Sequence, residues 1–367
     1  MNKLLSTGAI LASSTIAAHA GGLERADQSV LFMFEKGSYA EIALGHVKPS
    51  VSGSLDVNPS VTSGDMLESY TTGSLSYKTQ LNDQWHVGIQ LSEPHGADVA
   101  YPTSTDLPFP YGTAYPLQGT TAQVDITNLT AIVRYQANEN VSVYGGMRVG
   151  TASGKVDIPL QGYTMSTNRQ ADYGYLAGVA YERPDIALRV ALTYNSAITH
   201  EFSVEENGAP SLPFETTMPQ SVNLEFQTGI AADTLLFGVV RWVDWSEFDI
   251  SPAGYAMATG GDSLVSYDED TVSYRLGIGR QFTDAWSGAL TIGYEGQSSG
   301  FTGNLGPTNG YTTVGVAASY THDNMKITAG IQYAAIGEAN TDLGAFGTTT
   351  FDDNSAIGAG VRIGFSY

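Results

Sequence analysis

The sequence has no cysteine and few basic residues. Of its 367 residues, 16 are lysine or arginine and 37 are aspartate or glutamate, which gives a formal net charge of -21. The absence of cysteine excludes disulfides, thiol catalysis and cysteine metal sites, and it suits a chain that crosses an oxidising compartment. The acidic balance argues against nucleic acid as a partner, because nucleic-acid binding relies on basic side chains that neutralise phosphates.

Long apolar runs are also lacking. Beyond the first residues, no segment approaches the run of about 20 apolar residues that a membrane helix requires. At the N-terminus, Lys3 precedes a short apolar stretch over residues 4–18, and Ala18-His19-Ala20 has the form of a cleavage site. This order predicts a secretory signal peptide over residues 1–20, with an N-terminal anchor helix as the alternative.

What the sequence does contain is a hydrophobic period of two. In the C-terminal segment, Ile357, Val361 and Phe365 alternate with glycine and polar residues. Such alternation predicts β-strands rather than helices, and about 14 segments show it. The predicted strands span residues 38–48, 69–79, 85–93, 121–137, 140–152, 171–182, 186–198, 219–231, 234–247, 270–282, 285–297, 310–321, 325–337 and 354–367.

The connections between these strands alternate strictly between short and long. Short periplasmic turns and long extracellular loops are typical of outer-membrane barrels. A ring of about 14 strands is too wide for side chains to fill with an apolar core, so the apolar face must meet lipid. The sequence therefore predicts an all-β transmembrane antiparallel barrel over residues 38–367, closed by pairing of the strand that ends at Tyr367 with the strand at residues 39–47.

Enzyme motifs are not found. The histidines of the mature chain are isolated and form no metal-binding pair, and there is no G-x-S-x-G elbow and no phosphate loop. We therefore expect a protein that is not an enzyme and that uses no cofactor and no metal. Acidic runs at residues 266–270 and 351–353 are interpreted as solvated loops, with divalent cations that bridge to lipid headgroups as the alternative.

Several arginines fall on the predicted lumen face by parity. Two roles remain open for them: they brace the wall through ion pairs, or they bind the head of an anionic ligand. These arginines are Arg134, Arg148, Arg189, Arg275 and Arg362.

Two further features concern the path of a ligand. The third strand meets Ser92-Glu93-Pro94-His95-Gly96, where proline removes a ladder donor and glycine permits unusual backbone angles. This run predicts a kink or bulge, or simply the end of the strand. Apolar residues in the outer loops predict a landing site for a hydrophobic solute. They are Leu160, Tyr163, Met165, Phe202, Leu212 and Phe214.

At this point the chain resembles the FadL-type transporters of Gram-negative outer membranes, which carry long-chain fatty acids and other hydrophobic compounds. Met218-Pro219-Gln220-Ser221 is similar to the family's LP-x-S/E start of a strand. The run Trp242-Val243-Asp244-Trp245-Ser246-Glu247-Phe248 is similar to its W-x-x-W-S-x-F segment, and residues 191–196 and 274–279 also match. The resemblance covers most of the mature chain.

The resemblance implies passive uptake of a hydrophobic small molecule, with long-chain fatty acids as the expected solute. In that family the solute lands in a groove between outer loops, passes to an inner pocket and leaves sideways through a gap at a kinked third strand. The kink carries over onto residues 92–96 and the groove onto the loop residues named above. We expect a monomer among outer-membrane lipid and lipopolysaccharide, inserted by barrel assembly machinery.

The N-terminus departs from the family. Members carry a plug with an Asn-Pro-Ala element, whereas only residues 21–37 precede the first predicted strand here and contain no such element. Residues 30–34, which include Phe32 and Phe34, are expected to form a short apolar plug that contributes to the pocket. The alternatives are a general diffusion porin, against which few lumen charges by parity count, and a structural or adhesive barrel.

Overall fold

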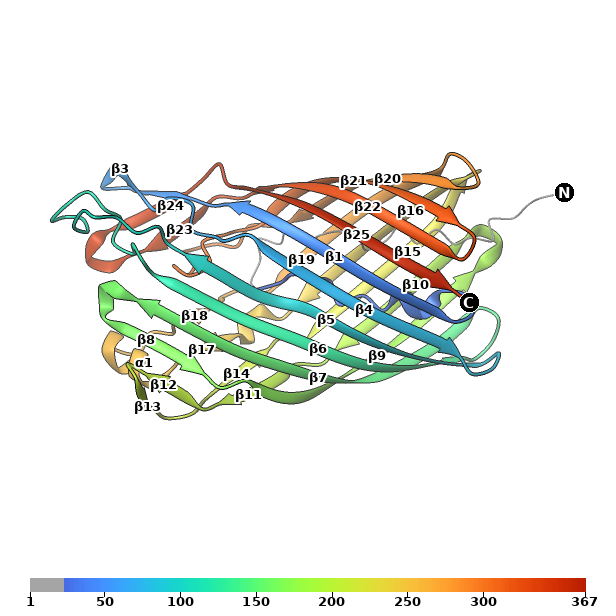
Figure 1. The fold of residues 1–367 in the computed structure, drawn as a ribbon, viewed down its shortest axis with the longest axis horizontal. Helices are drawn as coiled ribbons and strands as arrows, with labels where there is room; N and C mark the ends of the chain where they lie inside the picture. The colour runs from blue at the N-terminus through green and yellow to red at the C-terminus, as the bar shows by residue number, and fades with distance from the viewer. Residues whose placement is uncertain (1–22) are drawn as a thin grey trace.

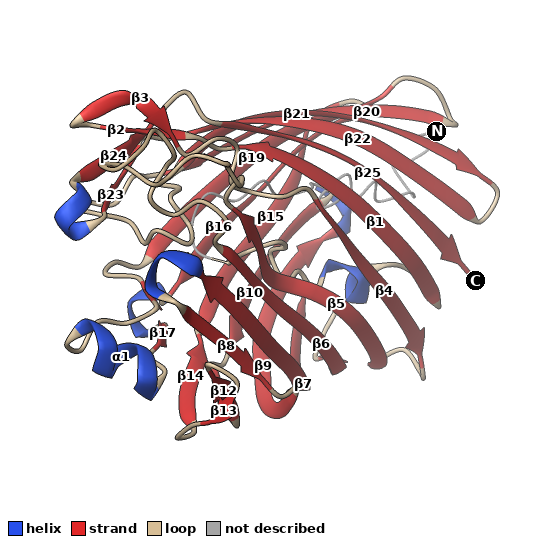
Figure 2. Ribbon diagram, turned by 60° about the vertical axis from the view of Figure 1, so that its left-hand side comes forward, coloured by secondary structure: helices blue, strands red, loops and turns tan. Residues whose placement is uncertain are grey.

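The computed structural model describes residues 23–367, and the predicted signal peptide at residues 1–20 lies outside the described residues. The described chain forms one closed antiparallel barrel of 14 strands (Figures 1 and 2). The barrel strands are β1 (Tyr39–Ser50), β4 (Tyr70–Gln80), β5 (Trp85–Ala100), β6 (Thr121–Gln136), β7 (Val141–Ile158), β9 (Gln170–Arg183), β10 (Leu188–Asn195), β15 (Ser221–Ala231), β16 (Thr234–Val243), β19 (Thr271–Gln281), β20 (Trp286–Glu295), β21 (Tyr311–His322), β22 (Met325–Ile336) and β25 (Ser355–Ser366).

The predicted architecture is confirmed. Each strand pairs with its sequence neighbours, and β25 closes the ring on β1 with Ala40 opposite Phe365 and Val47 opposite Gly358. The predicted spans lie on the observed strands, with ends that agree within four residues except at two strands. β7 extends to Ile158, past its predicted end at residue 152, and β5 was expected to end at Glu93. It continues to Ala100, because a one-residue register shift between Ser92 and His95 lets it keep pairing with β6. A bulge therefore bends this strand without ending it.

Burial is inverted relative to a soluble protein. On the outer surface Leu44 is 51% exposed and Ile331 is 60% exposed, whereas Lys78, Asn223 and Arg241 are at most 1% exposed inside the barrel. A closed ladder satisfies the backbone without water, so only the outward apolar side chains meet the surroundings. This arrangement is that of a multi-pass outer-membrane barrel, with the apolar face in lipid.

Exposed aromatic side chains mark the two edges of the apolar surface. One group lies near the short turns and the other near the long loops, as expected for rings that sit at the two lipid–water boundaries. The short-turn group includes Tyr77, Trp85, Tyr181 and Trp286, and the long-loop group includes Tyr173, Tyr274, Tyr294 and Tyr333.

The long loops carry their own small structure at one end of the barrel (Figure 2). Their strands are β2 (Gly53–Leu55), β3 (Asn58–Thr62), β8 (Tyr163–Thr167), β11 (Ile198–Phe202), β12 (Val204–Glu206), β13 (Ala209–Pro210), β14 (Phe214–Met218), β17 (Asp249–Ile250), β18 (Val265–Ser266), β23 (Ala339–Asp342) and β24 (Thr348–Phe351). The helices of the described chain are α1 (Ala253–Thr259) and the 3-10 turns η1 (Leu31–Phe34), η2 (Pro159–Gln161), η3 (Pro184–Ile186), η4 (Trp245–Glu247) and η5 (Gly344–Phe346). None of the helices within residues 23–367 has the length and apolar character needed to cross a membrane.

Inside the barrel, glycines make room for large side chains on the adjacent strand. A Cβ atom at Gly277 in β19 would lie 2.3 Å from the ring of Phe237, which is 3% exposed and directly opposite on β16. The aromatic ring therefore fills the space that the glycine leaves in the lumen wall.

We predict that Gly277→Val lowers the free energy of unfolding by about 1–3 kcal/mol, since it overpacks this contact. Valine has a higher strand propensity than glycine, so a loss of stability cannot come from a loss of strand propensity. The measurement is denaturant unfolding in lipid vesicles. Gly303→Val is the control, because no atom lies within 4 Å of a Cβ at that loop position. Equal stability of both variants would contradict this packing role.

Candidate solute-binding cavities

The N-terminal segment, residues 23–35, lies inside the barrel. Its turn η1 is buried together with Tyr144 of β7, Leu176 of β9 and Ala191 of β10. A Cβ at Gly88 in β5 would lie 2.3 Å from the sulfur of Met33, so this turn also rests directly on the wall. The segment thus lies within the lumen, with η1 near the short-turn end of the barrel.

The predicted lumen arginines hold this segment. Arg275 pairs with Asp27 at 2.6 Å, Arg148 donates to Gln28 at 2.9 Å, and Arg134 and Arg189 donate to the carbonyls of Met33 and Phe34 at 3.4 Å. The guanidinium groups of Arg134 and Arg189 lie 4.3 and 4.8 Å from the centre of the Phe34 ring. Arg362 instead lies 3.9 Å from Glu41 of β1. Two roles were left open for these arginines, bracing of the wall and binding of an anionic ligand. The described chain itself supplies the partners for bracing.

Arg241 is also a lumen arginine, and the sequence analysis did not predict it. It pairs with Glu24, each side chain being 1% exposed, and donates to Asn223 at 2.6 Å. Strand β16 turns Phe237, Val239 and Arg241 inward, so it is apolar on both faces and its parity does not reveal which face is the lumen. Together with Lys78, this residue gives the interior more charge than the count by parity indicated.

The bulge of β5 creates a local interruption in the wall. Pairing of β4 with β5 stops at Ser74 opposite Ser92. Beyond it, β5 pairs with the N-terminal segment: the N–H groups of Arg25 and Ala26 donate to the carbonyl of Pro94 at 2.7 and 3.1 Å, and Gly96 N–H donates to the carbonyl of Leu23 at 2.8 Å. The inner segment thus replaces β4 as the partner of this stretch.

The Arg25 side chain covers the interruption. Its guanidinium lies 4.4 Å from the ring of Tyr70, pairs with Asp98 at 2.7 Å and occupies the space where a Cβ of Gly96 would stand. Tyr70 begins β4 and Asp98 follows the bulge in β5, so this one side chain connects both sides of the gap.

The predicted loop residues divide into two groups. Tyr163 and Met165 are buried in an apolar cluster among the outer loops, and Phe202 and Phe214 face each other across β11 and β14 with ring centroids 5.6 Å apart. Leu160 and Leu212 are exposed instead, at 37% and 69%. Phe32 and Phe34 lie in the plug cluster rather than among these loops.

Glu206 fastens the loops to each other. Its carboxylate accepts from the Tyr163 hydroxyl at 2.7 Å, from the backbone of Gly254 and Tyr255 at 2.8 and 3.0 Å, and from Ser211. Burial alone would raise the pKa of Glu206, but these hydrogen bonds outweigh burial and lower it. The ionised form therefore holds β8, β12 and α1 together.

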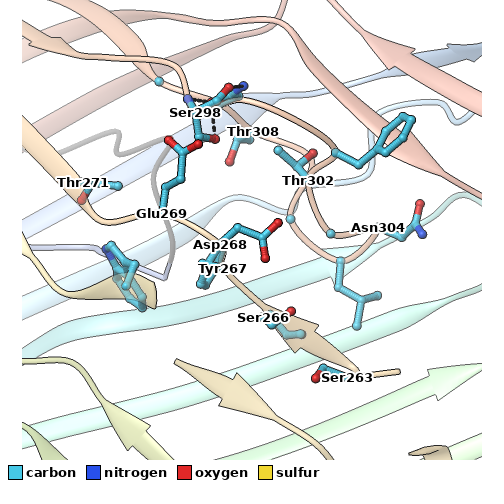
Figure 3. A pocket seen from close by; sticks show the side chains of 18 of the residues that line it. Ser263, Ser266, Tyr267, Asp268, Glu269, Thr271, Ser298, Thr302, Asn304 and Thr308 are labelled. Atoms are coloured by element: carbon cyan, nitrogen blue, oxygen red, sulfur yellow. Dashed lines mark hydrogen bonds between the residues drawn. The ribbon is translucent and has the colours of Figure 1, made fainter. Parts of the chain in front are cut away.

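The sequence did not predict the cavity that lies among the outer loops. A cavity of about 610 Å³, here called the outer cavity, lies between residues 262–272 and 294–310, with Trp245, Leu117 and Ile158 also in its wall. Figure 3 shows Asp268 and Glu269 next to Tyr267 on one side, with Thr302 and Asn304 across from them. Its lining is mostly small or polar, so no hydrophobic pattern in the sequence marks it.

A second space, the inner cavity, adjoins the bulge. It measures about 110 Å³ and is lined by the N-terminal residues 23–25, by residues 96–99 of β5 and by apolar side chains such as Leu67 and Ile250. Val265, Tyr267, Leu305, Gly306 and Thr308 line both cavities. These residues form the partition between the outer loops and the covered gap in the wall.

Comparison with solved structures addresses the fold. A Pseudomonas aeruginosa FadL homologue superposes with a TM-score of 0.71 at 12% identity over 91% of both chains. The Pseudomonas putida toluene transporter TodX gives 0.65 at 12% identity over 94% of this chain and 96% of that one, and the Ralstonia pickettii toluene transporter TbuX gives 0.57 at 12% identity over 91% and 90%. The chain has the FadL-type fold. No protein-family model and no curated protein sequence matches it.

We predict that Arg241→Ala frees the start of the N-terminal segment, because it leaves Glu24 buried without its cation at a cost of about 3–5 kcal/mol. Since the chain has no cysteine, a single Ala26→Cys can report on this through its rate of reaction with a maleimide. The rate should rise at least about tenfold while the barrel stays folded, since the ladder is made by backbone groups.

The control background is Arg183→Ala, whose ion pair with Asp185 is exposed on a short turn. It should leave the reaction rate at Ala26→Cys unchanged. An unchanged rate in Arg241→Ala as well would show that the Arg241–Glu24 pair does not hold the segment.

Proposed function

We propose that the chain is a member of the FadL-type family and a channel, not an enzyme, for passive uptake of hydrophobic molecules across the outer membrane. The observation that carries the proposal is the pair of adjoining cavities, which leads from the outer loops to the bulge of β5. Lipopolysaccharide resists apolar solutes, so a route through a protein wall offers them a path. Apolar burial would supply the binding at about 25 cal/mol per Å².

Two kinds of similarity support the proposal, and each suggests a class of solute. The resemblance in the sequence implies long-chain fatty acids, and the structural neighbours TodX and TbuX are toluene transporters. In the proposal the solute lands among the outer loops near Tyr163, Met165 and Phe214, crosses the partition and leaves sideways into the membrane at residues 92–96. The channel acts as a monomer among lipopolysaccharide, after insertion by barrel assembly machinery.

We predict faster uptake of radiolabelled fatty acid or toluene by cells that produce the chain than by cells with an empty vector. Phe202→Ala with Phe214→Ala should lower the rate severalfold, since it removes a buried aromatic pair. Tyr111→Ala, at an 85% exposed loop position, is the control. Liposome swelling in small sugars would favour a porin instead, and no uptake of either solute would favour a structural or adhesive barrel.

The side chain of Arg25 is the proposed latch of the lateral opening. It covers the gap through one partly exposed ion pair and one ring contact, which are interactions worth about 1 kcal/mol each. We predict that Arg25→Ala raises the uptake rate about two- to tenfold by leaving the gap uncovered.

Asp98→Asn should act in the same direction but more weakly, because the ring contact with Tyr70 remains. Arg169→Ala is the matched control, since Arg169 lies in an exposed loop with one long hydrogen bond to Thr151. If Arg25→Ala lowers uptake or leaves it unchanged, the solute does not leave beside Arg25.

A further inference from the structure

The outer cavity has charge of one sign only. Five carboxylates line it, and no lysine, arginine or histidine of the described chain does. The carboxylates belong to Asp262, Asp268, Glu269, Asp270 and Glu295. Burial would raise the pKa of Asp270, but hydrogen bonds from Ser246 and Trp242 lower it, so this group is ionised at neutral pH.

Two buried polar groups in the same wall lack partners. The indole N–H of Trp245 and the hydroxyl of Thr120 make no hydrogen bond within the described chain, although their side chains are 1% and 0% exposed. A buried donor without an acceptor destabilises the folded protein. Such groups in a cavity wall fit a ligand that brings an acceptor atom.

Trp245 also stands at the partition between the cavities. Its ring lies 5.2 Å from Tyr267 and 5.6 Å from Phe248, and it meets His95 of the β5 bulge edge-on at 5.9 Å. The donor is therefore embedded in an aromatic cluster that reaches from the outer cavity to the bulge. A ligand oxygen held there leaves the apolar body of the ligand against rings and against Leu305.

We propose that the outer cavity selects uncharged solutes that combine an apolar body with one hydroxyl or carbonyl oxygen, and that it rejects carboxylates. Repulsion from the five like charges disfavours an anion in this cavity. Four of them, on Asp262, Asp268, Glu269 and Asp270, are exposed, so salt weakens their repulsion, whereas Glu295 is buried. The inference rests on the proposed uptake function and revises its substrate class. At the outer cavity it places an alcohol or ketone above both fatty acids, which are carboxylates, and toluene, which has no oxygen.

A hydrophobic amine is the competing ligand class. The carboxylates would attract an ammonium group, but this group carries only donors and would leave the Trp245 N–H unpartnered. The unpartnered donors thus favour an oxygen acceptor over a cation. Amines therefore form one arm of the test.

The experiment compares decanol, decanoate, decylamine and decane, which share one chain length. Binding is followed in neutral-lipid nanodiscs at pH 8 through the indole N–H resonances of the four tryptophans, with that of Trp245 assigned by Trp245→Phe. Decanol should shift the Trp245 resonance and bind at least about tenfold more tightly than decanoate. Higher salt should narrow this ratio, because it screens the carboxylates.

Two sets of variants separate the contributions. Trp245→Phe should weaken the binding of decanol about three- to tenfold and leave the binding of decane unchanged, because only the hydrogen bond to the ligand oxygen is lost. The double variant Asp268→Asn with Glu269→Gln should tighten the binding of decanoate, because two repelling charges are removed, and leave the binding of decanol unchanged. Asp323→Asn is the control, because Asp323 is exposed on a short turn far along β21 from the loops.

Each outcome decides the inference. Decanoate binding as tight as decanol, or the tightest binding by decylamine, overturns it. So does decanol binding that leaves the Trp245 resonance unmoved. Uptake of decane and decanoate by cells without preferential decanol binding would preserve the proposed channel and reject this selectivity, whereas no uptake of any of these solutes would reject the channel itself.

Discussion

The hydrogen bonding of the backbone is the constraint on which the rest of this structure depends. In lipid, each strand must be paired on both sides, and the ring from β1 to β25 meets this requirement along nearly its whole length. The interruption beside β5 is informative for that reason. There the N-terminal segment supplies the missing donors and acceptor to Pro94 and Gly96. A segment that looks too short to be a plug thus completes the wall from within.

The same segment supplies partners for charged side chains in the lumen. An arginine turned inward from a barrel strand must find an acceptor, and the interior offers few apart from other side chains. Glu24 and Asp27 provide carboxylates to Arg241 and Arg275, and backbone carbonyls of Met33 and Phe34 serve Arg134 and Arg189. These charged groups therefore fix the position of a short segment within the lumen.

The sequence predicted the barrel well because a period of two and alternating loop lengths are local signals. All 14 strands lie where the alternation placed them, and the bulge at Pro94 follows from the chemistry of proline and glycine. The cavities were not predictable in this way. Trp245 lies far along the chain from Thr120 and from the partition residue Leu305, and only the folded loops bring them to one wall. Arg241 was not predicted as a lumen residue, because its strand β16 is apolar on both faces.

The strengths of these interactions indicate which part of the N-terminal segment can move. Displacing its backbone would break the Arg241–Glu24 and Arg275–Asp27 pairs, whose side chains are at most 13% exposed. Buried pairs of this kind are costly to break one partner at a time. Swinging the Arg25 side chain breaks only its contacts with Asp98 and Tyr70, and the Asp98 side chain is already 23% exposed. In the proposed passive channel, only the binding energy of the solute is available to open the wall. A side chain that swings aside on a fixed backbone needs less of this energy than displacement of the backbone.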